Sequence, residues 1–193
     1  MESIDSAKKM PGRPRSAASH RAMLKATLEL LSEVGFEAMS IEAIATRARV
    51  GKSTIYRRYN SKEELVADAI ETIREEVLIP DTGSVWGDMD ALIENAAQIT
   101  LTPLGRQAVA MIISSASSNP EFAQIYWEKY LSPRRQSFAV VIERAKARNE
   151  ISSNLDAGLI FDMMSGVMLY ALIFPPVEPW EDYVRCAISL FLK

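Results

Sequence analysis

Two short helix patterns joined by a turn occupy residues 40–59, and they limit the possible folds more than any other feature of the chain. Ser40 can cap the first helix, "IEAIATRAR", and the apolar residues of this helix share one face. Val50-Gly51 can then form a tight turn before the second helix, "KSTIYRRY". Two short helices joined by a turn that contains glycine form a helix-turn-helix.

The same stretch contains Gly51-Lys52-Ser53-Thr54, which is how a phosphate-binding P-loop ends. A P-loop has another glycine five residues before this one, because both glycines bend the loop around the phosphates, but here that position is Thr46. A P-loop also follows a buried β-strand, whereas the residues before Gly51 predict a helix rich in Ala and Arg. The sequence therefore argues against a nucleotide-binding loop and favours contact with nucleic acid.

The neighbouring segments predict helices as well. Apolar residues recur at spacings of three and four over residues 19–36, and Gly35 sits where a left-handed C-cap residue belongs. Ser61-Lys62-Glu63-Glu64 is a capping box that opens a long helix running on to Pro80. No segment before residue 80 alternates as a strand would.

The rest of the chain also predicts helices, and the expected fold is therefore all-α. The expected helices after residue 85 are 88–101, 104–118, 120–131, 133–148, 157–174 and 180–192. The expected organisation is a basic flexible arm at 1–18, a three-helix helix-turn-helix domain at 19–66, and a helical body at 67–193.

The charge distribution supports a DNA-binding N-terminal part. Residues 1–60 contain 11 Lys and Arg and 6 Asp and Glu, a net charge of +5, and the remaining residues contain 11 and 19, a net charge of −8, which together give the overall −3. A basic third on an acidic remainder is the layout of a DNA-binding head on a body that avoids DNA. Chance fluctuation among so few charges is the alternative.

The second helix of the pair would enter the major groove with its N-terminal residues leading. Ile55 and Tyr59 fall on one side and can dock on the first helix, whereas Arg57 falls on the opposite side. Arg side chains can pair with guanine edges, and Lys and Tyr can hold phosphates. A basic surface helix with no such role is the alternative. The residues predicted to contact DNA here are Thr46, Lys52, Ser53, Thr54, Tyr56, Arg57, Arg58 and Lys62.

These motifs resemble the DNA-binding domain of TetR-family transcriptional regulators. The resemblance covers residues 20–70 and is carried by "SIEAIATRARVGKSTIYRRYNSKEELVADAI", with Gly35-Phe36 before it. It implies an all-helical homodimer with one recognition helix in each subunit and a larger C-terminal domain that binds a small effector. It also implies a repressor that releases a palindromic DNA site when the effector binds.

The N-terminal arm contains "PGRPR", which resembles the Gly-Arg-Pro core that lies in A·T-rich minor grooves. Arg13 would enter the narrow groove while Pro14 keeps the chain extended, and Arg15 is a further predicted DNA contact. A solvated tail without function is the alternative.

Two apolar stripes in the C-terminal part predict a dimer interface, which would form a four-helix bundle from two copies. This part resembles one C-terminal subtype of the family, in which two long helices pair across the dimer. Burial of both stripes in the core of a single chain is the alternative. The stripes are Phe138, Val141, Ile142 and Ala145 on the first helix, and Leu159, Met163, Gly166, Val167 and Tyr170 on the second.

The effector is the least constrained part of the prediction. Aromatic and Met residues at helical spacing are more often plain core than a pocket, so each single residue is a weak candidate. The predicted partners are double-stranded DNA, a second copy of the chain and an unknown small, apolar or aromatic effector. The candidate pocket residues are Met111, Phe122, Tyr126, Trp127, Tyr130, Phe161, Met164 and Met168.

Other functional classes find little support in the sequence. The single His20 and single Cys186 lie far apart, and neither a metal-ligand spacing nor a nucleophile elbow occurs, so we expect no enzyme, cofactor or metal. A helical adaptor or scaffold is the remaining alternative. The most apolar run, residues 163–174, is shorter than the roughly 20 residues that span a bilayer, which predicts no membrane segment and a cytoplasmic location.

Overall fold

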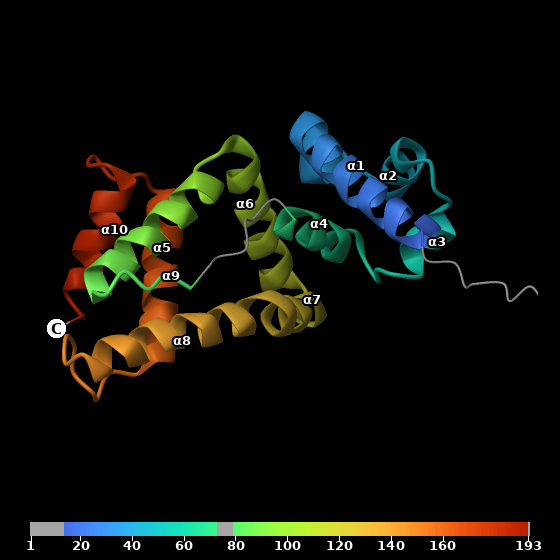
Figure 1. Ribbon diagram of the computed structural model, residues 1–193. Helices are drawn as coiled ribbons and strands as arrows, with labels where there is room; N and C mark the ends of the chain where they lie inside the picture. Colours follow the sequence, from blue (N-terminus) through green and yellow to red (C-terminus); the bar gives the residue numbers. More distant parts are fainter. Residues whose placement is uncertain (1–13, 73–78, 193) are drawn as a thin grey trace, which may run out of the picture.

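The computed structural model describes residues 14–72 and 79–192, and every regular element in these two ranges is a helix, which confirms the all-α prediction. Figure 1 shows α1–α4 at one end of the molecule, α6 and α7 in the middle, and α5, α8, α9 and α10 at the other end. The helices are α1 (Pro14–Ala38), α2 (Ile41–Ala48), α3 (Lys52–Tyr56), α4 (Lys62–Glu71), α5 (Val85–Thr100), α6 (Pro103–Ser118), α7 (Pro120–Tyr126), the π-helical turn η1 (Trp127–Leu131), α8 (Ser132–Ala147), α9 (Ala157–Ile173) and α10 (Trp180–Ser189).

The first helix is longer than the sequence predicts. α1 begins at Pro14, so residues 14–18 are helical and do not belong to an irregular arm. Proline is tolerated in the first turn of a helix because its missing N–H has no partner there. Gly35 has the positive φ expected for it, but with φ 75 and ψ 171 it interrupts the helix in an extended conformation, and a short helical turn continues to Ala38. Arg13 and residues 73–78, which include part of the predicted helix to Pro80, lie outside the described residues.

Side-chain caps fix the starts of α2 and α4 as predicted. The Ser40 hydroxyl accepts a hydrogen bond from the Ala43 N–H at 3.1 Å, and the Ser61 hydroxyl accepts one from the Glu64 N–H at 3.1 Å. The carboxylate of Glu64 returns to the N–H of Asn60, one residue earlier than a capping box requires. The positive φ in the turn between α2 and α3 belongs to Arg49, at 53°, and not to Gly51, whose φ is −74°.

Two hydrophobic cores hold the helices together. The first contains the buried residues of α1–α4 together with Ala108 and Met111 of α6 and Phe122 of α7, so it crosses the predicted domain boundary at residue 66. The second joins α5, α8, α9 and α10. α4 packs on α1, α6 and α7, and α1 also packs on α6, so these two helices join the DNA-binding head to the body.

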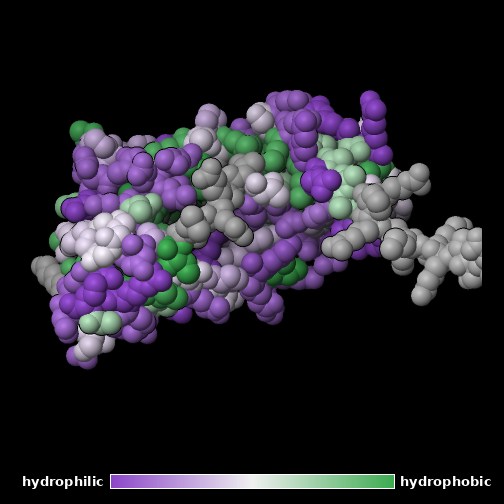
Figure 2. All heavy atoms as spheres, viewed as in Figure 1, coloured by the Kyte–Doolittle hydropathy of each residue, from purple (hydrophilic) through white to green (hydrophobic). Residues whose placement is uncertain are grey.

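The surface seen in Figure 2 is mostly hydrophilic, with hydrophobic side chains in small separate patches. In the described part of the chain, no helix has both the length and the apolar character needed to cross a membrane.

Candidate nucleic-acid interface

The faces of α3 agree with the division predicted from its sequence. Ile55 and Tyr59 are buried, with 0% and 4% of their surface exposed, and they seat α3 against α1, α2 and α4 in the first core. α3 itself is only five residues long, so Arg57, Arg58 and Tyr59 follow it in a turn. The side chains of Lys52, Ser53, Tyr56, Arg57 and Arg58 are exposed, and Thr54 is half-buried.

Arg57 is available to a ligand. The backbone N–H of Arg57 donates to the Ser53 carbonyl at 3.2 Å, which fixes the start of the side chain. Within residues 14–72 and 79–192, no hydrogen bond or ion pair engages its guanidinium. An arginine whose backbone is held in place and whose guanidinium is not engaged can form bidentate contacts with a base edge or a phosphate.

Arg49 is a second exposed arginine beside α3, and sequence reasoning missed it. It lies at the C-cap of α2 in a left-handed conformation, and its guanidinium has no ion-pair partner among the described residues. The left-handed conformation turns the chain sharply between the two helices. The only signal in the sequence was the basic character of "RARVGK", which does not reveal which residue takes the positive φ.

Lys52 and Thr46 contact the same residue of α2. The Lys52 ammonium donates to the Glu42 carboxylate at 2.7 Å, and this hydrogen bond lowers the pKa of Glu42 and raises the pKa of Lys52. The exposed hydroxyl of Thr46 donates to the Glu42 carbonyl at 2.8 Å. An exposed ion pair contributes little to stability, so Lys52 can exchange Glu42 for a phosphate at small cost.

Lys62, a predicted DNA contact, is engaged within the DNA-binding head. Its ammonium donates to the carbonyls of Phe36 at 2.8 Å and Met39 at 3.1 Å, and it lies 4.0 Å from the centre of the Phe36 ring. These partners belong to the last residues of α1 and the link to α2, whose carbonyls have no partner within a helix. In this arrangement Lys62 joins the start of α4 to the end of α1.

We expect the Lys62→Met substitution to lower the free energy of unfolding by about 1–2 kcal/mol, because it keeps the apolar stem and removes both hydrogen bonds to carbonyls. Urea unfolding monitored by circular dichroism measures the change. Lys25→Met is a suitable control, because Lys25 is an exposed lysine whose nearest carboxylate, that of Glu29, is 3.9 Å away. Equal stability of the Lys62 and Lys25 variants would contradict the structural role of Lys62.

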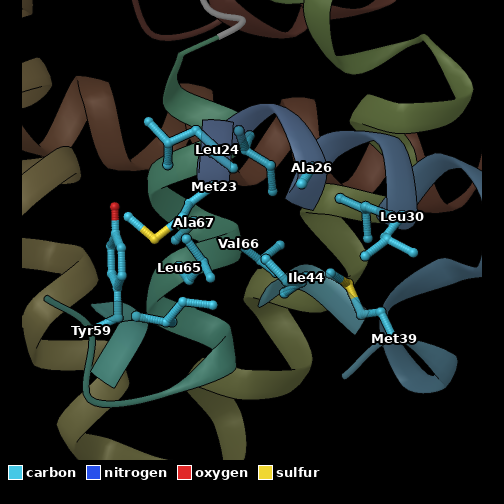
Figure 3. Close-up of a cluster of buried hydrophobic side chains, with 14 of the residues drawn as sticks. Met23, Leu24, Ala26, Leu30, Met39, Ile44, Tyr59, Leu65, Val66 and Ala67 are labelled. Carbon is cyan, nitrogen blue, oxygen red and sulfur yellow. The ribbon is translucent and has the colours of Figure 1, made fainter. Parts of the chain in front are cut away.

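Tyr59 belongs to a hydrogen-bond network centred on Asp68. The Tyr59 hydroxyl donates to one carboxylate oxygen of Asp68 at 2.6 Å, and His20 Nε2 lies 2.7 Å from the same hydroxyl. The second oxygen of Asp68 accepts from Lys129 Nζ and from the Tyr130 hydroxyl, each at 3.0 Å. Figure 3 shows the Tyr59 ring at the edge of the first core, next to Met23 and Leu65, with its hydroxyl pointing out of the cluster.

The network shifts the pKa values of Asp68, Tyr59 and Tyr130. Burial raises the pKa of the Asp68 carboxyl, but the hydrogen bonds from Tyr59, Lys129 and Tyr130 outweigh this effect and leave the pKa below its ordinary value. Burial, together with the Asp68 charge and hydrogen bond, raises the pKa of both Tyr59 and Tyr130. Asp68 is therefore an ionised acceptor, and both tyrosines remain donors, at neutral pH.

The predicted pocket residues are divided between two hydrophobic cores and the surface. Met111, Phe122, Tyr126 and Tyr130 are buried in the first core, which the body shares with the DNA-binding head. Met164 is buried in the second core, with Phe161 and Met168 packed against it. Trp127 is 44% exposed. These side chains pack against their neighbours because large apolar residues at helical spacing are driven out of water whether or not a ligand is present.

A different part of the body forms an open apolar hollow of about 370 Å³ between α6 and the end of α9. Among the described residues that line it, Arg106 alone is charged, and its guanidinium donates to the Leu172 carbonyl at 2.9 Å. This hollow was not predicted, because small aliphatic residues of a helix can face a core, a cavity or a partner. The lining residues are Arg106, Val109, Ala110, Ile113, Ser114, Leu172 and Ile173.

The predicted dimer stripes have different environments. The stripe on α8, formed by Phe138, Val141, Ile142 and Ala145, is buried in the second core of the same chain, so these residues are not available to a partner. The stripe on α9 is largely unpartnered: Leu159, Met163 and Tyr170 are 57%, 41% and 57% exposed, Gly166 is exposed, and Val167 is half-buried.

The hydrophobic surface on α9 extends beyond the predicted stripe. Ile173 and Phe174 are 53% and 62% exposed, and they continue the same line of residues to the end of the helix. We call Leu159, Met163, Gly166, Val167, Tyr170, Ile173 and Phe174 the α9 stripe. A continuous apolar surface of this kind marks an interaction site.

The described residues contain no group of His, Cys, Asp and Glu side chains that could hold a metal ion. The single histidine is instead engaged with Tyr59, and Cys186 is a free thiol on α10.

Comparisons with known proteins agree with this architecture. Residues 23–69 match the family described as bacterial regulatory proteins, tetR family, and residues 79–191 match the tetracyclin repressor-like C-terminal domain. The chain is 31% identical over 175 residues to YdeS of Bacillus subtilis, an uncharacterized HTH-type transcriptional regulator, and the match covers 90% of this chain and 88% of YdeS.

Solved structures share the fold. The TetR family transcription regulator SCO0332 aligns with a TM-score of 0.74 and 23% identity over 89% of this chain and 94% of its own. FadR of Thermus thermophilus, a TetR-family transcriptional repressor solved in complex with lauroyl-CoA, aligns with a TM-score of 0.72 and 17% identity over 89% of this chain and 92% of its own. With both domain families matched and the helix-turn-helix exposed at one end of the molecule, this chain belongs to the TetR family of DNA-binding transcriptional regulators.

Proposed function

We propose that this regulator is a repressor, which binds a palindromic operator as a homodimer and releases it when a small apolar effector binds the body. The observation that carries the DNA-binding part is the division of α3 and its following turn: Ile55 and Tyr59 are buried while Arg57 is exposed and open at its tip. This division orients one side of the recognition segment towards a ligand.

The exposed residues fall into two kinds of expected contact. Ser53 and Arg57 face away from the core and are proposed to meet base edges in the major groove. Lys52, Tyr56, Arg58 and Arg49, which surround them, are proposed to meet phosphates, with Thr46 and Thr54 at the margin. Arg13 and Arg15 remain predicted contacts, either with the minor groove or with the backbone beside it.

The α9 stripe is the proposed dimer interface. A two-fold axis would pair each stripe with its copy, because a dimer interface uses the same patch on both subunits. The two recognition helices would then lie about 34–36 Å apart, or a multiple of this distance, along a palindromic site.

The effector proposal rests on the hollow between α6 and α9. Its lining is apolar apart from Arg106 and Ser114, which suits a small apolar molecule with an anionic or polar end. FadR, which shares the fold, was solved with lauroyl-CoA, a ligand of this general character. An adaptor that binds no DNA is the second candidate, and its only support is the apolar α9 stripe, which would suit another protein as well as a second copy.

A binding-site selection from random duplexes tests the proposal and separates it from the adaptor. Wild-type protein should enrich a palindromic sequence. Arg57→Ala should weaken binding to that sequence by about 1–3 kcal/mol and relax the preference at one or two base pairs. Arg185→Ala, which removes an exposed arginine paired with Asp90 in the body, is the matched control and should bind like wild type.

Two outcomes would contradict the proposal. Failure of the wild-type protein to enrich any sequence would favour the adaptor. An unchanged sequence preference in Arg57→Ala would show that this arginine does not face the base edges.

A further inference from the structure

Asp68 lies where the DNA-binding head meets the body, and it joins residues far apart in the sequence. One of its carboxylate oxygens accepts from the Tyr59 hydroxyl, which follows α3, and the other accepts from Lys129 and Tyr130 in the π-helical turn η1. His20 of α1 lies 3.5 Å from the first oxygen. A single side chain therefore contacts the recognition segment, α1 and the body.

The proton positions in this cluster follow from the distances. Tyr59 has one hydroxyl proton, and the 2.6 Å contact with an ionised carboxylate uses it. The 2.7 Å contact with His20 must then use a lone pair of the Tyr59 oxygen, so Nε2 of His20 carries a proton. His20 thus donates to Tyr59, and Tyr59, Lys129 and Tyr130 all donate to Asp68.

The body side of the cluster is well anchored. The Tyr130 ring is buried in the first core and lies 5.1 Å from the ring of Tyr126. One helical turn past Asp68, Glu71 of α4 contacts Arg134 of α8, which gives α4 a second tie to the same part of the body. Single π-helical turns often occur at functional sites, and η1 brings Lys129 and Tyr130 to the same carboxylate oxygen.

On the side of the DNA-binding head, the hydrogen-bond network of Asp68 reaches α3 through Tyr59. The Tyr59 backbone N–H donates to the Ile55 carbonyl at 3.0 Å, and Ile55 is the residue that buries α3. The Tyr59 side chain thus ties the last turn of the recognition segment to Asp68. A change in the hydrogen bonds between Asp68 and the body alters how strongly the carboxylate charge acts on the Tyr59 hydroxyl, because the carboxylate is only partly exposed to water.

We propose that Asp68 is a positioning residue that couples the body to the recognition segment, so that losing its contacts with Lys129 and Tyr130 weakens DNA binding. This inference rests on the proposed DNA-binding function and deepens it by naming the residues through which the body controls α3. Among the described residues, the hydrogen bonds of Lys129 and Tyr130 go to Asp68 and not to α3, so we expect their effect on DNA binding to pass through Asp68.

The test is a double-mutant cycle, read as affinity for the duplex that the wild-type protein selects from a random library. Lys129→Met removes one donor and keeps the stem, Tyr130→Phe removes only a hydroxyl, and Asp68→Asn removes the charge at nearly constant size. Each single variant should weaken binding roughly threefold or more. Lys129→Met combined with Asp68→Asn should bind no more weakly than Asp68→Asn alone.

Arg185→Ala is again the matched control, because the ion pair between Arg185 and Asp90 is equally a body contact but does not reach the head. Thermal melts of every variant separate positioning from a purely structural role. A lower melting temperature with wild-type DNA affinity in both Lys129→Met and Tyr130→Phe would overturn the inference, and so would additive effects in the double variant.

A second readout needs no DNA, so failure of the proposed function and failure of the coupling can be told apart. Amide hydrogen exchange in residues 52–60 should be faster in Lys129→Met than in wild type, whereas exchange in α10 should be unchanged. If exchange is faster but the wild-type protein selects no duplex, the coupling is supported and the DNA-binding proposal is contradicted. Unchanged exchange in residues 52–60 would overturn the coupling, whatever the DNA result.

Discussion

Replacing Tyr59 by alanine should lower the free energy of unfolding by about 3–5 kcal/mol, because it removes a large ring that is 4% exposed and leaves a cavity in the first core. For a chain of this length, the melting temperature should fall by about 6–20 °C. The ring packs beside Met23 and Leu65 in the first core (Figure 3). Thermal melts and urea unfolding measure the loss.

Tyr59→Phe is the matched variant, because it keeps the ring and removes the hydroxyl. Its cost should be about 1–2 kcal/mol, since Asp68 loses its shortest hydrogen bond but keeps those from Lys129 and Tyr130. Sequence preference in a binding-site selection should survive in Tyr59→Phe. If Tyr59→Ala melts like wild type, the ring does not seat α3, and the orientation assigned to Arg57 fails with it.

The parts of this fold that the sequence predicted are those set by neighbouring residues. The caps by Ser40 and Ser61 each use an N–H three residues further along, so these hydrogen bonds can be predicted from a few neighbouring residues. The burial of Ile55 and Tyr59 also follows from local geometry, because helical spacing places them on one side.

The contacts that the sequence did not reveal join distant segments. Lys62 meets carbonyls of residues 26 and 23 positions earlier, and Lys129 meets Asp68 across 61 positions. Nothing in the local pattern of either lysine indicates such a partner, and an exposed lysine near a recognition helix is an ordinary phosphate contact. The sequence therefore predicted a DNA contact for Lys62 and no role for Asp68.

The dimer and pocket residues are harder to predict, because an apolar pattern indicates burial without naming the partner. Phe138 and Ile142 form a stripe that any neighbouring helix can cover, and α5 and α9 of the same chain do so. α9 is apolar over most of its circumference, so periodicity cannot tell which side remains after the core is filled. The packing of the body left Leu159, Met163 and Tyr170 exposed.

A charge introduced into the α9 stripe should separate the proposed dimer. In Met163→Glu the new carboxylate occurs twice in a two-fold interface, and burying it beside an apolar partner, with its own copy nearby, costs several kcal/mol. The dissociation constant of the dimer should rise by about 100-fold or more. Met163 is 41% exposed in the single chain, so the chain should fold and melt nearly as wild type does.

Sedimentation equilibrium at several protein concentrations measures the dissociation constant. Val34→Glu is the control, because Val34 is 49% exposed on α1, at the opposite end of the molecule from α9 (Figure 1). The control should remain dimeric, whereas Met163→Glu should become monomeric and lose most of its affinity for a palindromic duplex, since one subunit reaches only one half-site. A wild-type dissociation constant in Met163→Glu would place the dimer interface elsewhere and leave the α9 stripe to a different protein, as the adaptor alternative requires.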